Sequence, residues 1–297
     1  MEESHSETQK KSWHDKYYKV LLIIPFSLVV FSFIYLGLFY SQHNDIMLKD
    51  ISLTGGTSVT LNDNLIDATD LEDFLQNRLE EMTFKEISDL TTGEKVAIII
   101  ETKTDAETTK KILEEYLNYE LTDENSSMEF TGSSLSTSFY KQLLIALLIS
   151  FVFMSIVVFL LFKNAVPSGA VIFSAFADIL MTLATVNILG IKMSSAGIIS
   201  LLMLIGYSVD TDILLTNRLL RRHEGTVNEK ISGAFKTGIT MTLTSLIAVL
   251  VSFFVVNSFS SVLSQIFTIL IIGLIFDMFN TWITNVSILK WYVERKK

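Results

Sequence analysis

The chain has 297 residues, of which 49% are hydrophobic and 19% charged, with two prolines and no cysteine. Its mean hydropathy of +0.45 points to lipid as the solvent for much of the polypeptide. The lack of cysteine excludes a disulfide scaffold, a thiolate zinc site and a cysteine nucleophile. The net charge of −9 argues against nucleic acid as a partner.

This charge is segregated along the chain. The range 45–135 carries 21 acidic and 7 basic residues, a balance of −14, so the remainder sums to +5. We therefore expect four parts, an acidic module lying between apolar ones. They are a cytoplasmic tail over 1–19, a transmembrane helix over 20–44, an extracytoplasmic α+β domain over 45–135, and a membrane region over 136–297 that ends in the cytoplasm.

The first apolar segment, 20–44, has 25 residues without Asp, Glu, Lys or Arg. About 20 residues suffice to cross a bilayer as a helix, so this segment predicts a transmembrane helix. Its apolar core is too long for a cleavable signal and lacks a small-x-small cleavage pattern. We expect it to remain as an anchor.

The sequence of the acidic module predicts a definite order of strands and helices. Alternation and β-branched residues predict strands, and Asp67 and Thr104 are placed to cap two helices. The predicted order is strand 51–61, helix 68–82, strand 84–90, a turn at 92–93, strand 96–102, a helix to 117 and strand 128–131. This is the order of a ferredoxin-like split unit, a small α+β fold.

Five further transmembrane helices follow the module. The segment 142–162 is free of charge, 164–191 contains only Asp178, and 193–217 contains only Asp210 and Asp212. The segment 237–276 is too long for one span, and its polar residues at 257–261 divide it, so that the last helix covers about 262–288 and includes Asp277. The fold class is therefore an all-α membrane protein of six helices with the α+β domain inserted between helices 1 and 2.

Lysine and arginine in the short loops predict the orientation. Fourteen lie on one side and Lys192 alone on the other, so both termini should be cytoplasmic and the domain 45–135 extracytoplasmic in a multi-pass cell-membrane protein. The fourteen are Lys10, Lys11, Lys16, Lys19, Lys163, Arg218, Arg221, Arg222, Lys230, Lys236, Lys290, Arg295, Lys296 and Lys297.

Four intramembrane acids are the candidates for chemistry. A carboxylate at the bilayer centre costs about 2.5 to 3.5 kcal/mol, and Asp178, Asp210 and Asp277 fall near the midplane. A structural interpretation stays open, in which Asp210 and Asp212 are hydrated near the cytoplasmic boundary and Asp277 packs beside Asn280 and Asn285. The functional interpretation is favoured for Asp178 and Asp210, because neither has a nearby cation in its own helix.

Helix geometry separates two of these acids. Asp210 and Asp212 point about 200° apart, whereas Asp210 and Asn217 share one face. That polar stripe either carries water or protons or packs the polar groups of neighbouring helices. The hydroxyl-rich run 237–245 in the fifth helix is expected mainly to permit close helix contact.

The segment GYSVDTDILLTNR at 206–218 resembles the fourth-helix signature of the SecD/SecF family of protein-export membrane proteins, in the form of its archaeal SecF branch. Gly206, Tyr207, Ser208, Thr211 and Arg218 carry this signature. The segments LTGGT at 53–57 and GSSL at 132–135, and the aspartate at position 178, agree with it.

The resemblance implies an accessory subunit of the Sec machinery within the resistance-nodulation-division superfamily. Such a subunit pairs with SecD, joins the SecY translocon and promotes late translocation or release of the exported preprotein, while membrane lipid surrounds its helices. Six helices with one inserted domain form half of that superfamily's pseudo-twofold unit, so a partner half is expected. The bacterial family is thought to couple intramembrane carboxylate protonation to swinging of the outer domain.

Two departures from the bacterial pattern concern this coupling. The bacterial fourth-helix acid stands at the place of Thr211, between Asp210 and Asp212 here, and the bacterial helix-five arginine is replaced by Thr240 or a neighbour. Which ion is used, and what replaces that arginine, stay open.

Two hypotheses about mechanism follow. Asp178, Asp210, Asp212 and Asp277 are candidates for a proton relay, because a proton crossing the membrane is worth about 2.3 kcal/mol per 100 mV and can bias a helix equilibrium. Gly55 and Gly56 form either a hinge of the outer domain or a simple bulge.

Two other functions share some of these features. Half of a lipid or drug exporter would require a larger outer domain than 45–135. An intramembrane aspartyl protease would use Asp178 and Asp210 as a dyad, but its Tyr-Asp and Gly-x-Gly-Asp motifs are absent. No phosphate-binding loop, histidine cluster or thiolate occurs, so we expect no catalytic residue, cofactor or metal.

Overall fold

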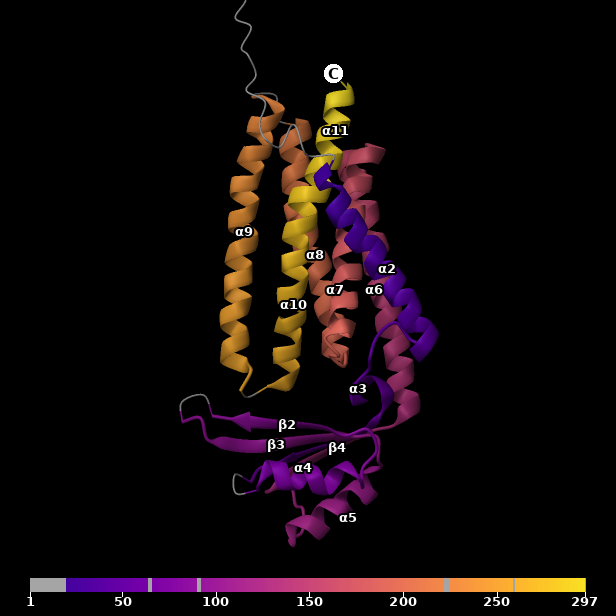
Figure 1. Ribbon diagram of the computed structural model, residues 1–297, viewed down its shortest axis with the longest axis vertical. Coiled ribbons are helices and arrows are strands. Elements are labelled where there is room, and N and C mark those ends of the chain that lie inside the picture. The colour runs from indigo at the N-terminus through magenta and orange to yellow at the C-terminus, as the bar shows by residue number, and fades with distance from the viewer. Residues whose placement is uncertain (1–19, 64–65, 90–91, 222–224, 259, 297) are drawn as a thin grey trace, which may run out of the picture.

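The computed structural model describes residues 20–63, 66–89, 92–221, 225–258 and 260–296. A bundle of long helices forms a membrane domain, and a small α+β domain lies across one end of it (Figure 1). The tail 1–19 with its four lysines, and also Leu90, Arg222 and Lys297, lie outside the described residues.

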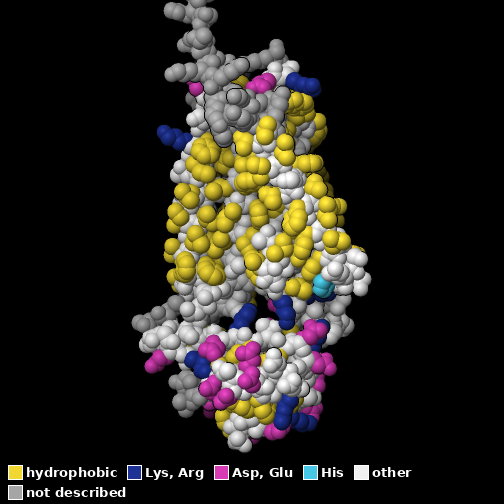
Figure 2. Space-filling view, viewed as in Figure 1, with side chains coloured by type: hydrophobic (Ala, Val, Ile, Leu, Met, Phe, Trp, Pro, Cys, Tyr) yellow, Lys and Arg dark blue, Asp and Glu magenta, His cyan; other side chains and the backbone are white. Residues whose placement is uncertain are grey.

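Within the described residues, six helices are long and apolar enough to cross a membrane, as the sequence predicts, in agreement with a multi-pass membrane protein. The sixth span contains a π-helix between two α-helical parts. The spans are α2 (Ile23–His43), α6 (Ser133–Phe162), α7 (Ala165–Ile188), α8 (Ser195–Arg221), α9 (Val227–Val256), and α10 (Ser261–Phe279) continued by η1 (Asn280–Asn285) and α11 (Val286–Lys296). Figure 2 shows hydrophobic side chains around this bundle and acidic ones over the α+β domain.

Two helices begin well before the charge-free windows that predict them. The helix α6 begins nine residues before position 142, and α9 begins ten residues before position 237. A charged residue interrupts an apolar window, but the helix itself continues past that residue. The helix begins or ends at its capping residue. For α9 that cap is a capping box, in which the Thr226 hydroxyl accepts from the Glu229 amide and the Glu229 carboxylate accepts from the Thr226 amide.

The α+β domain has the ferredoxin-like order predicted from the sequence. Its four strands form an antiparallel sheet in the order β2-β3-β1-β4. Its elements are β1 (Gly56–Leu61), α4 (Ala68–Gln76), β2 (Thr83–Ser88), β3 (Lys95–Thr102), α5 (Ala106–Leu117) and β4 (Ser126–Thr131). The two helices cover one face of the sheet, and the other face is turned toward the membrane domain (Figure 1).

Three local predictions in this domain need correction. Residues 51–54 form a short helix, α3 (Ile51–Thr54), because Asp50 caps it and Leu53 packs among the membrane helices, so the first strand begins only at Gly56. The helix predicted to Met82 ends at Gln76, where the chain turns so that the Glu80 carbonyl accepts from β3.

The second helix of the domain is capped one residue later than predicted. Asp105, not Thr104, is the N-cap, and its carboxylate accepts from the Thr108 amide at 3.0 Å. The Thr104 carbonyl accepts instead from the Thr57 hydroxyl of β1 at 2.7 Å. Thr104 is thus held by a contact with the sheet, and the helix α5 begins one residue later than predicted.

The α+β domain is fastened to the membrane domain by backbone pairing. The Met193 amide donates to the Leu48 carbonyl at 2.7 Å, and the Asp50 amide donates to the Met193 carbonyl at 3.0 Å. The edge strand β2 adds a second contact, where the Ser88 amide donates to the Ser258 carbonyl at 2.9 Å. The domain is thus held at two separate places.

Candidate functional site

The helix α8 separates its two neighbouring acids completely. Asp212 is fully buried within the membrane domain, whereas Asp210 is exposed on the outer surface of the helix. Two residues along an α-helix turn about 200°, so the two side chains leave opposite faces. The angular separation expected from the sequence thus places one acid inside the bundle and the other outside it.

Asp212 is joined inside the bundle by Asp178 of α7 and Asp277 of α10, and all three carboxyl groups are 0% exposed. We call these three residues the acid cluster. The helices α7, α8 and α10 pack against one another at the centre of the domain, and this packing brings together residues about 100 positions apart in the sequence. Of the four candidate acids, the structure therefore groups three and leaves Asp210 apart.

Asp178 accepts hydrogen bonds on both of its oxygens. The Ser208 hydroxyl of α8 donates to Oδ2 at 2.6 Å, and the Asn280 amide of η1 donates to Oδ1 at 2.7 Å. The hydroxyl of Thr284 donates in turn to Asn280 Oδ1 at 3.3 Å, which orients the amide. Asp178 is thus held between α8 and the sixth span.

The other two acids share a hydroxyl. Thr281 Oγ1 donates to Asp212 Oδ1 at 2.8 Å and lies 3.3 Å from Asp277 Oδ1, so it can turn from one acid to the other. The Asn285 amide donates to Asp212 Oδ1 at 2.7 Å. The second oxygens of Asp212 and Asp277 are buried without a hydrogen-bond partner among the described residues.

The π-helix η1 supplies most of these donors. Asn280, Thr281, Thr284 and Asn285 all lie on it, and none is more than 1% exposed. Single π-helical turns inside α-helices are rare and occur frequently at functional sites. The sequence predicts Asn280 and Asn285 beside Asp277 as packing partners, whereas in the structure they donate hydrogen bonds to Asp178 and Asp212.

The acid cluster has no cationic partner among the described residues. Within the described part of the chain, no ion pair involves Asp178, Asp212 or Asp277, and their partners are hydroxyl and amide groups. A buried carboxylate without a cation is costly, and a carboxyl group avoids that cost by binding a proton. The described residues also contain no group of three or more His, Cys, Asp and Glu side chains suited to a metal. The cluster is therefore a set of buried carboxyl groups whose hydrogen-bond partners among the described residues are uncharged.

The other signature residues of α8 lie in three different settings. Ser208 touches the acid cluster, as described above. Thr211 is buried, and its hydroxyl lies 3.5 Å from that of Thr242 on α9. The Arg218 guanidinium donates to the Thr237 hydroxyl of α9 at 2.8 Å. Gly206 and Tyr207 are exposed on the same side as Asp210.

The contact between α9 and the bundle depends on a small residue. A Cβ on Gly238 would overlap the indole ring of Trp282 and lie 3.3 Å from Thr211. Gly238 thus permits the close helix contact expected from the sequence, whereas Thr244 of the same run is exposed and donates to a carbonyl of its own helix. Thr211 meets Thr242 at this contact, whereas Thr240, the position named for the bacterial arginine, is exposed and donates to the Lys236 carbonyl of its own helix.

Gly55 and Gly56 lie at the boundary between the two domains. Both have positive φ angles, of 85° and 149°, which favour glycine. A Cβ on Gly55 would lie 2.6 Å from the Ser133 Cα at the start of α6, and one on Gly56 would overlap the Thr102 carbonyl of β3. Close backbone approach therefore requires both glycines, and their action as a hinge stays a prediction.

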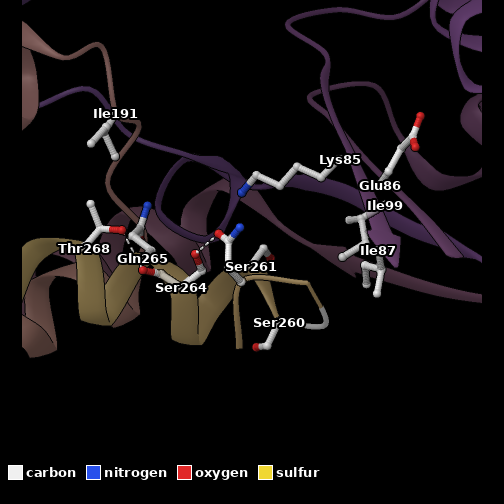
Figure 3. A pocket seen from close by; sticks show the side chains of 11 residues that line it. Lys85, Glu86, Ile87, Ile99, Ile191, Ser260, Ser261, Ser264, Gln265 and Thr268 are labelled. Carbon is white, nitrogen blue, oxygen red and sulfur yellow. Dashed lines mark hydrogen bonds between the residues drawn. The ribbon is translucent and has the colours of Figure 1, made fainter. Parts of the chain in front are cut away.

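A cleft of about 340 Å³ with both polar and apolar lining lies between β2, β3 and the start of α10 (Figure 3). Lys85 extends from β2 toward Ser261 and Ser264, and Ser264 donates to Asn257 at 2.8 Å. A neighbouring cleft of about 270 Å³ is lined by Asp50 and Glu101. Burial from water raises the pKa of both these carboxyl groups above their ordinary values. The interface between the domains is thus partly open, and polar and apolar side chains both line it.

Comparison with known proteins agrees with this architecture. Residues 110–295 match the model of the family described as protein export membrane protein SecD/SecF, C-terminal. The protein-export membrane protein SecF of Methanocaldococcus jannaschii is 40% identical over 285 residues, which cover 94% of this chain and 96% of the relative. The chain belongs to the SecF family. SecF of Thermococcus gammatolerans is 50% identical over 153 residues, about half of each chain.

Solved structures of SecDF share the fold. A translocon-associated SecDF from Thermus matches with a TM-score of 0.72 at 18% identity, covering 94% of this chain and 38% of that one. SecDF in a super-membrane-facing form matches with a TM-score of 0.60, again at 18% identity. The SecF chain therefore spans only about two fifths of each SecDF chain. The relatives that show the family are named as protein-export proteins, not as proteases or drug exporters.

Proposed function

We propose that this SecF-family chain works with SecD at the SecY translocon to promote late translocation or release of preproteins, and that the acid cluster couples this work to the proton gradient. The names of its relatives support a role in protein export. The observation that carries the coupling is the cluster itself, which holds three buried carboxyl groups with no ion pair in the described part of the chain.

The cluster can connect proton binding to helix packing. Its members lie on three helices, and Asp178 is bonded to both α8 and η1. A change of charge on one acid alters which of these hydrogen bonds is favourable, and thus favours one of two packings. A proton crossing the membrane supplies about 2.3 kcal/mol per 100 mV, which is enough to bias such an equilibrium.

The proposed orientation places both termini in the cytoplasm and the α+β domain outside. Positive charge supports it, because Lys192 lies at the domain end of the bundle while Lys163, Lys230 and Lys236 lie at the other end. Membrane lipid would contact the apolar outer surfaces of α2, α6 and α9. The α+β domain would then face the emerging preprotein and move about Gly55 and Gly56, where the membrane-domain core ends and β1 begins.

The experiment reconstitutes this chain with SecD and the SecY translocon in vesicles and measures preprotein release with and without a proton gradient. Asp178→Asn and Asp212→Asn keep the side-chain shape but cannot ionise, so we expect each to insert normally and to abolish most of the stimulation by the gradient. Asp212→Glu keeps a carboxyl group and should retain part of it.

The control is Asp123→Asn, which alters an exposed acid of the α+β domain and should leave release unchanged. Gradient-stimulated release at the wild-type rate in Asp178→Asn and Asp212→Asn would refute the relay. Loss of release in all variants, the control included, would point to a general defect of the preparation.

A further inference from the structure

A groove of about 440 Å³ lies on the outer surface of the membrane domain, between α2, α9 and the sixth span. Its nine lining side chains are all hydrophobic. Leu28 comes from α2, Phe235 and Ile239 come from α9, and the others come from α10 and η1. Leu28, Phe235 and Ile275 are 37%, 45% and 49% exposed, so the groove opens away from the bundle.

The groove lies in the half of the membrane domain that is remote from the α+β domain. Ile275 and Trp282 are 14 and 21 residues from Ser261, about 21 Å and 31 Å along the sixth span. Ile239 is 17 residues from Val256, about 26 Å along α9. Both distances begin at the helix end next to the α+β domain (Figure 1). Since the hydrocarbon core of a bilayer is about 30 Å thick, the groove faces the lipid chains of the leaflet farther from that domain, which we call the remote leaflet.

The dimensions and lining of the groove suit a lipid chain better than a protein helix. A transmembrane helix is about 10 Å wide and fills roughly 420 Å³ with each turn of 5.4 Å, so the groove has room for about one turn. Helices in a membrane associate largely through small residues and hydrogen bonds, whereas the lining here is bulky and apolar, and the Trp282 indole nitrogen is buried beneath the surface. A hydrocarbon chain is narrower and needs no hydrogen bond.

A lysine stands beside the end of the groove. Lys236 follows Phe235 directly on α9 and precedes Ile239 by three residues, so it neighbours the groove on the helix surface. It is exposed and forms no ion pair with a described residue. It is 20 residues from Val256, about 30 Å along the helix, which is the depth of the headgroups, and a lysine side chain extends readily toward them.

We infer that the groove binds one hydrocarbon chain of an anionic phospholipid from the remote leaflet, and that the Lys236 ammonium binds the negatively charged headgroup of the same lipid. The chain contacts Trp282 and Ile283 of η1, while Thr281 of the same π-helix donates to Asp212. The lipid thus packs against the segment that orients the acid cluster. This binding requires neither SecD nor SecY and is independent of the proposed function.

Tryptophan fluorescence tests the occupant. The chain has three tryptophans, Trp13, Trp282 and Trp291, so the double substitution Trp13→Phe and Trp291→Phe leaves Trp282 as the only one. The full chain is placed in vesicles of phosphatidylcholine mixed with phosphatidylglycerol, and one of the two lipids carries bromine on its chains. Bromine quenches an indole that it contacts. Quenching at each composition therefore gives the relative affinity of the two lipids for the groove.

We expect phosphatidylglycerol to be favoured about fivefold at Trp282, which is the preference that one lysine near an anionic headgroup provides. Lys236→Gln should remove this preference. Lys163→Gln is the matched control, because it alters an exposed lysine at the same end of the bundle, on α6, and should leave the preference unchanged.

Three results would overturn the inference. Equal affinity of the two lipids for the chain with Lys236 intact would mean that the headgroup is not bound. An equal loss of preference in Lys236→Gln and Lys163→Gln would mean that general surface charge attracts the lipid. Absence of quenching by either brominated lipid would mean that protein covers the groove.

A second test fills the groove. Ile275→Phe enlarges an exposed lining side chain, whereas Ile156→Phe makes the same change on α6 at a position that is 48% exposed and outside the groove. Mass spectrometry of the intact, detergent-purified chain measures the phosphatidylglycerol that stays bound. We expect a severalfold loss in Ile275→Phe and none in Ile156→Phe, with melting temperatures near that of the wild type. Equal retention in the two variants would overturn the groove as the binding site.

Discussion

The two domains of this chain are built in opposite ways. The α+β domain has an apolar core, with Val59, Leu71, Ile98 and Leu113 fully buried, and carries its charges on the surface. The membrane domain has an apolar surface and keeps its acid cluster at the centre. The reason is the solvent. Moving an apolar side chain from water into a protein core lowers the free energy, whereas moving a leucine from lipid into a core gives no such hydrophobic gain. Buried polar groups therefore suggest function in the membrane domain, where they are costly.

The largest effect is expected in the apolar core of the α+β domain. Leu113→Ala opens a cavity at a side chain that is 0% exposed, and should lower the free energy of unfolding of this domain by about 2 to 5 kcal/mol. Limited proteolysis of the full chain against temperature measures it. Val96→Ala, at a position 50% exposed, is the control and should change the result little. Equal losses of stability in Leu113→Ala and Val96→Ala would contradict an apolar core as the main source of stability in the α+β domain.

A smaller effect is expected at the centre of the membrane domain. Asp277→Asn removes a buried ionisable group without changing its shape, so thermal stability should stay within about 1 kcal/mol of the wild type while gradient-stimulated export falls. Leu204→Ala, at a side chain 0% exposed against Gly273, should lower the melting temperature. A marked loss of stability in Asp277→Asn would show that the cluster serves structure.

The smallest effect is expected at the interface between the domains. Burial raises the pKa of Glu101 above its ordinary value of 4.5, and Asp50 raises it further, while Lys85 and Lys192 oppose the shift. A raised carboxyl pKa means that the folded state holds its proton more tightly than the unfolded state, so stability falls as the pH rises from about 4.5 through the pKa of the folded state.

The variant Glu101→Gln should show a smaller decrease than the wild type, because burial also raises the pKa of Asp50, which remains. Melting temperatures of the full chain between pH 4 and pH 7 measure it, and Glu124→Gln, at an exposed position, should follow the wild type. A wild-type pH dependence in Glu101→Gln would show that this carboxyl group is not the source. Such a result would also mean that Glu101 at the interface affects the pH dependence of stability no more than an exposed carboxyl group of the α+β domain does.

Much of the architecture follows from local pattern. Long apolar windows, three of them interrupted by aspartates, predict the six spans, because a bilayer sets both the length and the composition of a helix that crosses it. The order of strands and helices in 45–135 predicts the ferredoxin-like sheet. Element ends were less predictable at α4, α5 and α6, where contacts from distant residues or continuation of the helix beyond the apolar window set the boundary.

The candidate site was only partly predictable. Four acids stood out by their cost in lipid, but their grouping depends on contacts between residues 30 to 100 positions apart, such as Ser208 and Asn280 with Asp178. The π-helix that carries Thr281 has no evident signal in the sequence. A hydroxyl group in an apolar helix can face any neighbour until the packing is known.

The sequence by itself determined that this chain crosses a membrane six times, carries an acidic inserted domain and has four costly aspartates, since hydropathy and charge are local properties. Only the tertiary structure decided which aspartates meet. The packing of α7, α8 and α10 encloses Asp212 with Asp178 and Asp277 and leaves Asp210 on the opposite face of the same helix. Helix periodicity separates the two side chains, but the neighbouring helices decide which one is inside.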